Sequence, residues 1–227
     1  MTRIQTKALI FDMDGTMVDS IPHHKKSLSL FCERHRICVD IDDLMRRTNG
    51  RNGAETMREL FQHPLEDDEA WALIREKETI YREIFSPVFK EIAGFKNFTA
   101  QARALGLKIG VGTAGDIQNV EFVLRHLQMN PAPDAIARGD EGLTGKPTPA
   151  IFLEAAKRIK IAAEHCIVFE DAPFGIEAAR RAGMRAVAIC STHSAAELAG
   201  PHVIASVSNY NELDPHFLSG LTHVEHA

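Results

Sequence analysis

The feature that most constrains the fold is a regular alternation of short apolar runs with amphipathic segments from about residue 95 onward. The expected strands are the runs at 107–113, 134–137, 166–170, 185–190 and 203–207. The expected helices are the segments at 96–105, 116–128, 149–159 and 174–182, where spacings such as Val120, Val123, Leu124 and Leu127 mark one apolar face. Such alternation predicts a parallel sheet with helices on both faces.

The first expected strand, at 7–11, lies far from the others in sequence. It ends at the turn signal Asp14-Gly15, and about 70 residues without a strand pattern follow, between 21 and 92. A crossover connection needs only about a dozen residues. We therefore predict an α/β chain with a doubly wound, Rossmann-like parallel-sheet core. Residues 1–20 and 92–227 would form this core, and residues 21–91 an inserted all-helical cap domain.

Composition and charge narrow the possible partners. The chain has 26 Lys and Arg against 31 Asp and Glu, a net charge of −5, which does not favour nucleic acid or anionic membranes. No apolar run approaches the ~20 residues of a membrane span. Four scattered cysteines form no CxxC pair, and the chain starts without a secretory signal. We expect a cytoplasmic protein that binds a small molecule, with a monomer favoured but the oligomeric state open.

Polar residues follow the expected strands at the edge where parallel sheets bind ligands, where the strand order reverses. They comprise four carboxylates, one hydroxyl and one lysine: Asp12, Asp14, Thr113, Lys146, Glu170 and Asp171. Packing alone does not require four acids to gather against their mutual repulsion. A divalent cation would relieve that repulsion.

These residue types indicate phosphoryl transfer. Asp12 and Asp14 are two residues apart, so in extended backbone their side chains point the same way. Such oxygen ligands suit Mg²⁺. A carboxylate can attack phosphorus and form an aspartyl-phosphate, while Lys146, the Thr113 hydroxyl and the following loop with Ala114 bind the phosphoryl group. Asp14 could protonate the leaving oxygen and deprotonate the attacking water, a role that needs a raised pKa.

Four motifs occur in order, each at an expected strand end. They are Phe11-Asp12-Met13-Asp14-Gly15-Thr16, Thr113, Gly145-Lys146-Pro147 and Glu170-Asp171. Together they resemble the signature of the haloacid dehalogenase superfamily, over nearly the whole chain. The inserted helices resemble the small cap of its β-phosphoglucomutase-like subgroup.

The resemblance implies a role for each motif. Asp12 would be the nucleophile and a metal ligand, and Asp14 the general acid and base with its backbone carbonyl on the metal. Thr113 and Lys146 would hold the transferring phosphoryl group. Asp171, supported by Glu170, would complete the Mg²⁺ site.

The resemblance also suggests substrate-binding residues in the cap. His24 stands where the mutase has a histidine that gates the acid and base, and Lys77 where it has a substrate-facing lysine. The mutase arginine that holds the second phosphate corresponds to Gly53, and Arg51 could replace it only with a different loop path. Arg51 and Asn52 are the expected pocket residues of this loop.

These observations favour a Mg²⁺-dependent phosphatase that hydrolyses a small phosphate monoester, a sugar phosphate first of all, through an aspartyl-phosphate. Three alternatives stay open. They are a phosphosugar mutase of the β-phosphoglucomutase type, an inorganic pyrophosphatase and a non-catalytic module that binds a phosphorylated metabolite.

Overall fold

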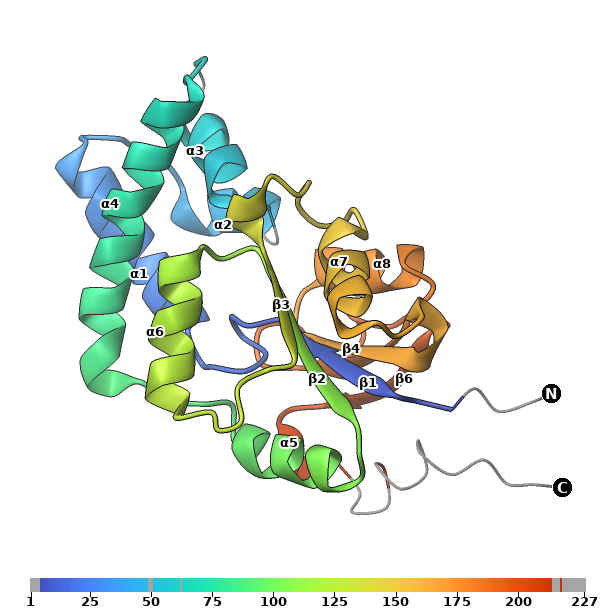
Figure 1. The fold of residues 1–227 in the computed structure, drawn as a ribbon. Helices are drawn as coiled ribbons and strands as arrows, with labels where there is room; N and C mark the ends of the chain where they lie inside the picture. Colours follow the sequence, from blue (N-terminus) through green and yellow to red (C-terminus); the bar gives the residue numbers. More distant parts are fainter. Residues whose placement is uncertain (1–4, 49–50, 62, 214–216, 218–227) are drawn as a thin grey trace, which may run out of the picture.

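The computed structural model describes residues 5–48, 51–61, 63–213 and 217, and its centre is one six-stranded parallel sheet (Figure 1). The strands are β1 Ala8–Phe11, β2 Lys108–Thr113, β3 Ala135–Arg138, β4 Cys166–Glu170, β5 Arg185–Ile189 and β6 Val203–Val207. Their order is β3-β2-β1-β4-β5-β6. Strand order runs outward from the β1–β4 pair in both directions, so the switch point where ligands bind lies between these two strands.

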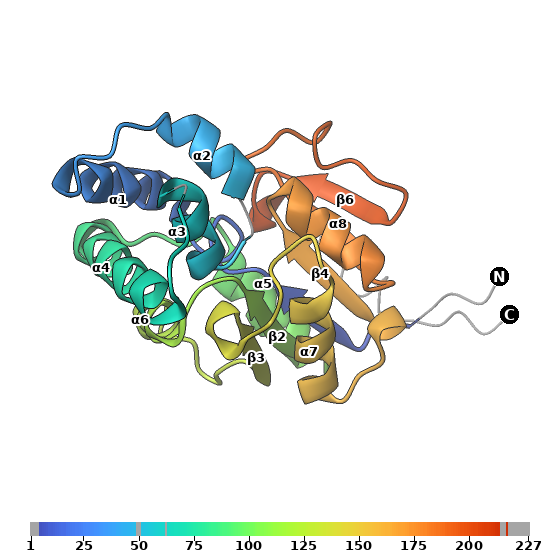
Figure 2. The same ribbon diagram turned by 90° about the horizontal axis from the view of Figure 1, so that it is seen from above.

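Helices cover both faces of the sheet, as the alternating pattern predicts (Figures 1 and 2). They are α5 Phe95–Ala104, α6 Ile117–Leu127, α7 Ala150–Ile159 and α8 Pro173–Arg181. Successive side chains of a strand point to opposite faces. Leu9 and Phe11 of β1 therefore join the hydrophobic cluster under α5 and α6, while Ala8 and Ile10 join the cluster under α7 and α8.

The segment between β1 and β2 forms four further helices, here called the helical unit. They are α1 Ile21–Arg34, α2 Ile41–Thr48, α3 Gly53–Phe61 and α4 Asp67–Phe85. They lie together to one side of the sheet in both views and share their own hydrophobic cluster, which includes Phe31, Leu44, Met57 and Ile74 (Figures 1 and 2). Short 3₁₀ helices complete the structure: η1 Ser86–Val88, η2 Gly139–Glu141, η3 Ala163–His165 and η4 Tyr210–Glu212.

The observed elements differ from the sequence expectation mainly at their ends. Asp116 lies just outside α6, where its carboxylate accepts a hydrogen bond from the Asn119 amide at 2.8 Å, as expected of an N-cap. Gly53, expected in a loop, begins α3, because the Asn52 side chain caps this helix by accepting from the Glu55 amide at 2.9 Å. Residues 49 and 50 of that loop lie outside the described residues. Within the described ranges, no helix is both long enough and apolar enough to cross a membrane.

Candidate active site

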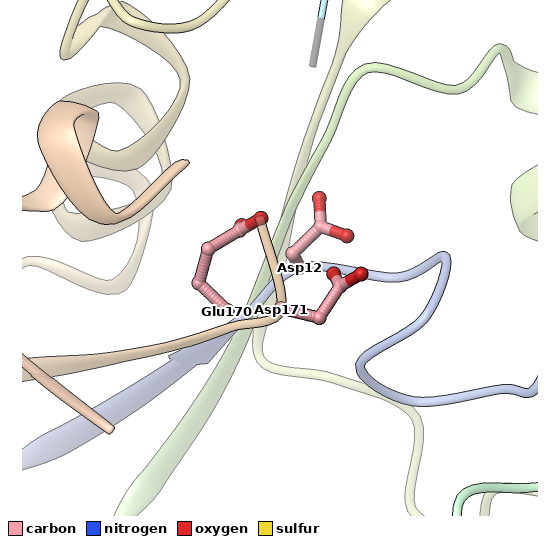
Figure 3. Close-up of side chains that lie close together, drawn as sticks. All are labelled: Asp12, Glu170 and Asp171. Carbon is pink, nitrogen blue, oxygen red and sulfur yellow. The ribbon is translucent and has the colours of Figure 1, made fainter. Parts of the chain in front are cut away.

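Three buried acids meet at the carboxyl ends of β1 and β4. Asp12 follows β1, Glu170 ends β4 and Asp171 comes next (Figure 3). The Asp12 amide donates to the Phe169 carbonyl at 3.0 Å, which keeps the two strand ends paired. One carboxylate oxygen from each acid lies within 4.8 Å of the others. The switch point of the sheet therefore holds a compact set of hard oxygen donors.

The charge of this cluster is incompletely neutralised. Burial raises the pKa of Asp12 despite the neighbouring Lys146, and raises the pKa of Glu170 well above its ordinary value. Burial and the charge of Asp12 raise the pKa of Asp171 to about 7. Oxygen donors whose mutual repulsion opposes ionisation fit a divalent cation, which would relieve that repulsion. The carboxylates of Asp12, Glu170 and Asp171 are thus the side chains that can hold a divalent cation.

Lys146 lies inside the same cluster. Its Nζ donates to Asp12 Oδ1 at 2.5 Å and to Glu170 Oε2 at 2.8 Å, and its side chain is buried. Burial alone would lower the pKa of this lysine, but the two carboxylates outweigh it and raise the pKa above its ordinary value. The ammonium is therefore charged at neutral pH and lies beside the expected nucleophile.

Hydroxyl groups fix Asp171. Thr16 Oγ1 donates to Asp171 Oδ1 at 3.0 Å, and Thr192 Oγ1 donates to Asp171 Oδ2 at 2.5 Å. Gly15 allows this approach: its φ is +80°, and a Cβ atom there would lie 2.3 Å from Asp171 Oδ2. Thr192 did not emerge from the sequence, because nothing marks a threonine 21 residues beyond Asp171 as its partner.

The Asp14 carboxylate does not join the other three acids. β1 ends at Phe11, so the extended backbone that would align Asp14 with Asp12 does not continue. Asp14 Oδ1 instead accepts hydrogen bonds from Ser20 Oγ at 2.6 Å and His24 Nε2 at 3.0 Å. Burial would raise the pKa of Asp14, but the hydrogen bonds from His24 and Ser20 and the charge of Lys77 lower it below its ordinary value. The expected raised pKa is therefore not found in this arrangement.

His24 connects Asp14 to α4. Lys77 Nζ lies 2.8 Å from His24 Nδ1 and 2.8 Å from Glu78 Oε1. An ammonium only donates, so Nδ1 accepts and the ring proton is assigned to Nε2, which donates to Asp14. Tyr81 stacks on the His24 ring with centroids 3.7 Å apart. The structure thus brings the expected residues His24 and Lys77 to the expected acid–base residue.

Glu78 and Tyr81 are further residues that the sequence analysis did not single out. Glu78 Oε2 accepts from Asn119 Nδ2 at 2.7 Å, which links α4 to α6. The signal that could have found Tyr81 is its helical spacing of four residues from Lys77, which places both on one face of α4.

The remaining expected residues divide into two groups. Thr113 is buried at the end of β2, where its Oγ1 accepts from the Gly115 amide at 3.0 Å, and with Ala114 and Arg51 it lines the cavity described below. Asn52 instead uses its side chain to cap α3.

A cavity of about 180 Å³ lies over the acid cluster, between the helical unit and the sheet edge. Its floor includes Asp12, Lys146 and Thr113, and part of its far wall is apolar. That wall comes from the helical unit and includes Leu28, Met45, Met57, Trp71 and Ile74. The cavity is smaller than the roughly 300–1,000 Å³ of pockets for drug-sized ligands, so it suits a small metabolite.

Comparison with known proteins finds similar sequences and a similar fold. A family model described as haloacid dehalogenase-like hydrolase matches residues 9–189. Fructose-1-phosphate phosphatase YqaB of Escherichia coli (strain K12) is 34% identical over 185 residues, covering 79% of this chain and 94% of that protein. β-Phosphoglucomutase of Bacillus subtilis (strain 168) is 28% identical over 190 residues, covering 81% and 83%. A solved hydrolase of family IA, variant 3, from Entamoeba histolytica HM-1:IMSS matches with a TM-score of 0.82 and 26% identity, over 96% and 99% of the two chains.

Proposed function

The chain belongs to the haloacid dehalogenase-like hydrolase family, and on that premise we propose that it is a Mg²⁺-dependent phosphatase of a small sugar phosphate. The observation that carries the proposal is the buried cluster of Asp12, Glu170 and Asp171 with Lys146 inside it, at the switch point of the sheet. A sugar phosphate is the substrate class because the cavity is small and the relatives include a fructose-1-phosphate phosphatase.

In the proposed reaction, a carboxylate oxygen of Asp12 attacks phosphorus. The bond between phosphorus and the ester oxygen breaks, and that oxygen takes a proton from Asp14, which requires that bound substrate raise the pKa of Asp14 above its lowered value in the free site. Water then attacks the aspartyl-phosphate and gives a proton to Asp14, the bond between Asp12 and phosphorus breaks, and phosphate leaves. Lys146 and Thr113 hold the phosphoryl oxygens throughout. A bound Mg²⁺ would add positive charge beside those oxygens.

We also propose that the helical unit is the cap domain, with boundaries near residues 20/21 and 91/92. Two observations support this division. The unit has a hydrophobic cluster of its own, and its two connections to the core lie side by side. The Asp19 amide donates to the Lys90 carbonyl at 2.9 Å, and the Ile92 amide to the Met17 carbonyl at 3.0 Å. Movement about these paired connections would open and close the cavity.

Phosphorus NMR on the purified protein tests the proposal. The protein is incubated with Mg²⁺ and a panel of phosphosugars, nucleotides and pyrophosphate. Release of inorganic phosphate fastest from a phosphosugar supports it. Conversion of a hexose 1-phosphate to the 6-phosphate without free phosphate would identify a mutase instead, and fastest release from pyrophosphate a pyrophosphatase.

Substitution of the nucleophile supplies the second part of the test. Asp12→Asn is expected to lose all turnover while circular dichroism and thermal unfolding show an intact fold. Turnover retained by this variant would contradict the aspartyl-phosphate. Binding of phosphosugars by the wild type without any turnover would identify a non-catalytic module.

A further inference from the structure

We infer that the cavity selects phosphate monoesters whose leaving group is uncharged, and that Asp116 and Asp140 enforce this choice by repelling a second phosphate. The inference rests on the proposed function and names its substrate class more closely. It predicts that sugar bisphosphates and pyrophosphate are poor substrates although they carry the same reacting group.

The N-terminus of α6 lies at the cavity. The amides of a helix N-terminus form a ready site for an anion. Here two carboxylates of the protein already take them: Asp116 Oδ1 accepts from the Asn119 amide at 2.8 Å, and Asp140 Oδ2 accepts from the Ile117 amide at 3.1 Å. Both acids line the cavity. A second phosphate therefore meets two carboxylates at this helix end.

Glu78 lines the wall beside Asp116 and Asp140. Burial and the negative charges of Glu78 and Asp140 raise the pKa of Asp116, and they outweigh the Asn119 hydrogen bond and the charge of Arg82, which lower it. The surroundings of Asp116 thus disfavour its ionised form. A phosphate dianion entering this part of the cavity would meet the same repulsion.

Two cations outside the cavity lining partly offset these acids. Arg138 Nε donates to Asp140 Oδ1 at 2.9 Å, and the charge of Arg82 acts on Asp116. A phosphate inside the cavity would meet the carboxylates rather than these arginines, so the cations that line the cavity decide whether it is bound.

Among the described residues that line the cavity, the Lys and Arg side chains are Arg51, Lys77 and Lys146. Lys146 is bound to Asp12 and Glu170, and Lys77 to Glu78. Arg51 is 40% exposed, and its Nη1 lies 3.8 Å from Glu59 Oε2. Each of these cations already faces a carboxylate.

Gly53, which stands where the mutase has its arginine, supplies no further cation. A Cβ atom at this position would lie 2.5 Å from Ile74 Cγ1, so the start of α3 leaves no space for a side chain there. Residues 49, 50 and 62, which lie outside the described ranges, are Asn, Gly and Gln and carry no charge. The apolar far wall likewise offers nothing to a second phosphate, whereas it can contact the carbon skeleton of an uncharged sugar.

The test compares fructose 1-phosphate with fructose 1,6-bisphosphate and pyrophosphate, at saturating free Mg²⁺. We expect kcat/KM for the wild type to be at least 100-fold higher for the monophosphate. Asp116→Asn keeps a good N-cap and Asp140→Asn keeps the side-chain shape, but each removes one charge. Each is expected to raise the bisphosphate-to-monophosphate ratio of kcat/KM about tenfold. Asp134→Asn, an acid outside the cavity, is the matched control and should leave the ratio unchanged.

Each outcome has a distinct meaning. If no phosphosugar releases phosphate, the proposed function fails. If the monophosphate and the bisphosphate are turned over equally well, the function stands and the inference is overturned. If the wild type discriminates but neither variant changes the ratio, the assignment to Asp116 and Asp140 is wrong. Should a variant fail to fold, the wild type decides: higher ionic strength should narrow the ratio, because salt screens charge repulsion, and an unchanged ratio would contradict the inference.

Discussion

At the scale of single residues, the hydrogen bonds from two hydroxyls to Asp171 lead to a testable prediction about metal binding. Thr192→Val removes the hydrogen bond to Asp171 Oδ2 but keeps the side-chain shape. Partners that orient a ligand typically account for 10–100-fold in metal affinity. We therefore expect Thr192→Val to weaken Mg²⁺ binding about tenfold or more, measured by isothermal titration calorimetry and by the Mg²⁺ dependence of phosphate release.

Thr79→Val is the matched control for this substitution. The Thr79 hydroxyl donates to the Arg75 carbonyl at 2.7 Å on the exposed face of α4, far from Asp171 in the fold. The Thr79→Val variant should bind Mg²⁺ as the wild type does. Equal Mg²⁺ affinity in Thr192→Val and the wild type would show that Thr192 does not orient the acid.

The cysteines make a second prediction at this scale. Burial raises the pKa of the Cys166 thiol to about 12, whereas Cys38 is exposed. Because the thiolate is the reactive form, Cys38 should react with 5,5′-dithiobis(2-nitrobenzoate) at pH 8 and Cys166 only after denaturation. Cys38→Ser should remove the rapid reaction. Rapid labelling of Cys166, detected by mass spectrometry of the native protein, would contradict its burial.

Residues of the site differ in how far the sequence could predict them. Asp12 and Glu170 were predictable because each lies at the end of an expected strand, and parallel strands end at one edge. Lys146 was predictable from the Gly145-Lys146-Pro147 motif in the loop after the third expected strand. The direction of the Asp14 carboxylate was not, because it depends on Ser20 and His24, which approach only after α1 is positioned. Partners that meet through tertiary structure leave no local pattern.

At the scale of elements, Asp134 joins the start of β3 to β2. Its amide donates to the Ile109 carbonyl at 2.7 Å, and its Oδ2 accepts from the Ile109 amide at 2.9 Å and from Arg103 at 3.1 Å. Burial would raise the pKa of Asp134, but these hydrogen bonds and the charges of Arg103 and Lys108 lower it below its ordinary value of 3.8. The carboxylate therefore stabilises the fold above that pH, and this contribution is lost as the pH falls through the folded-state pKa.

Asp134→Asn is accordingly expected to lower the free energy of unfolding by about 1–2 kcal/mol at neutral pH. The difference from the wild type should shrink as the pH falls below 3.8, the ordinary pKa of the carboxyl. Urea unfolding at several pH values measures this. A difference that does not depend on pH would mean that ionisation of the carboxyl is not what stabilises the fold.

Elements with a strong periodic pattern were predictable almost to the residue, as with the helix expected at 116–128 and found at Ile117–Leu127. The start of α3 was not, because Gly53 in a sequence suggests a loop. A residue without a side chain is needed there because Ile74 of α4 leaves no space for a Cβ atom. The sequence alone does not distinguish a glycine that close packing requires from a glycine that a turn requires.

At the scale of the whole molecule, Gly145 brings the core into contact with the helical unit. A Cβ atom at Gly145 would lie 2.6 Å from Glu55 Oε2 and 3.1 Å from both Arg51 Cα and the Asn52 amide nitrogen. Gly145 precedes Lys146, so this contact lies next in sequence to a residue of the site. The sequence shows a glycine before the lysine, but its contact with Arg51, Asn52 and Glu55 is visible only in the fold.

We expect Gly145→Ala to hold the two parts slightly apart and to lower kcat/KM severalfold, with little change in thermal stability. Gly142→Ala is the contrasting control on the same connection. A Cβ atom there meets nothing within 4 Å, but φ is +76°. A left-handed residue that is not glycine costs about 1–2 kcal/mol, so this variant should unfold at lower temperature while its kinetics stay unchanged. Kinetics of Gly145→Ala equal to those of the wild type would show that turnover does not need the parts this close, and that the cavity can work in a more open arrangement.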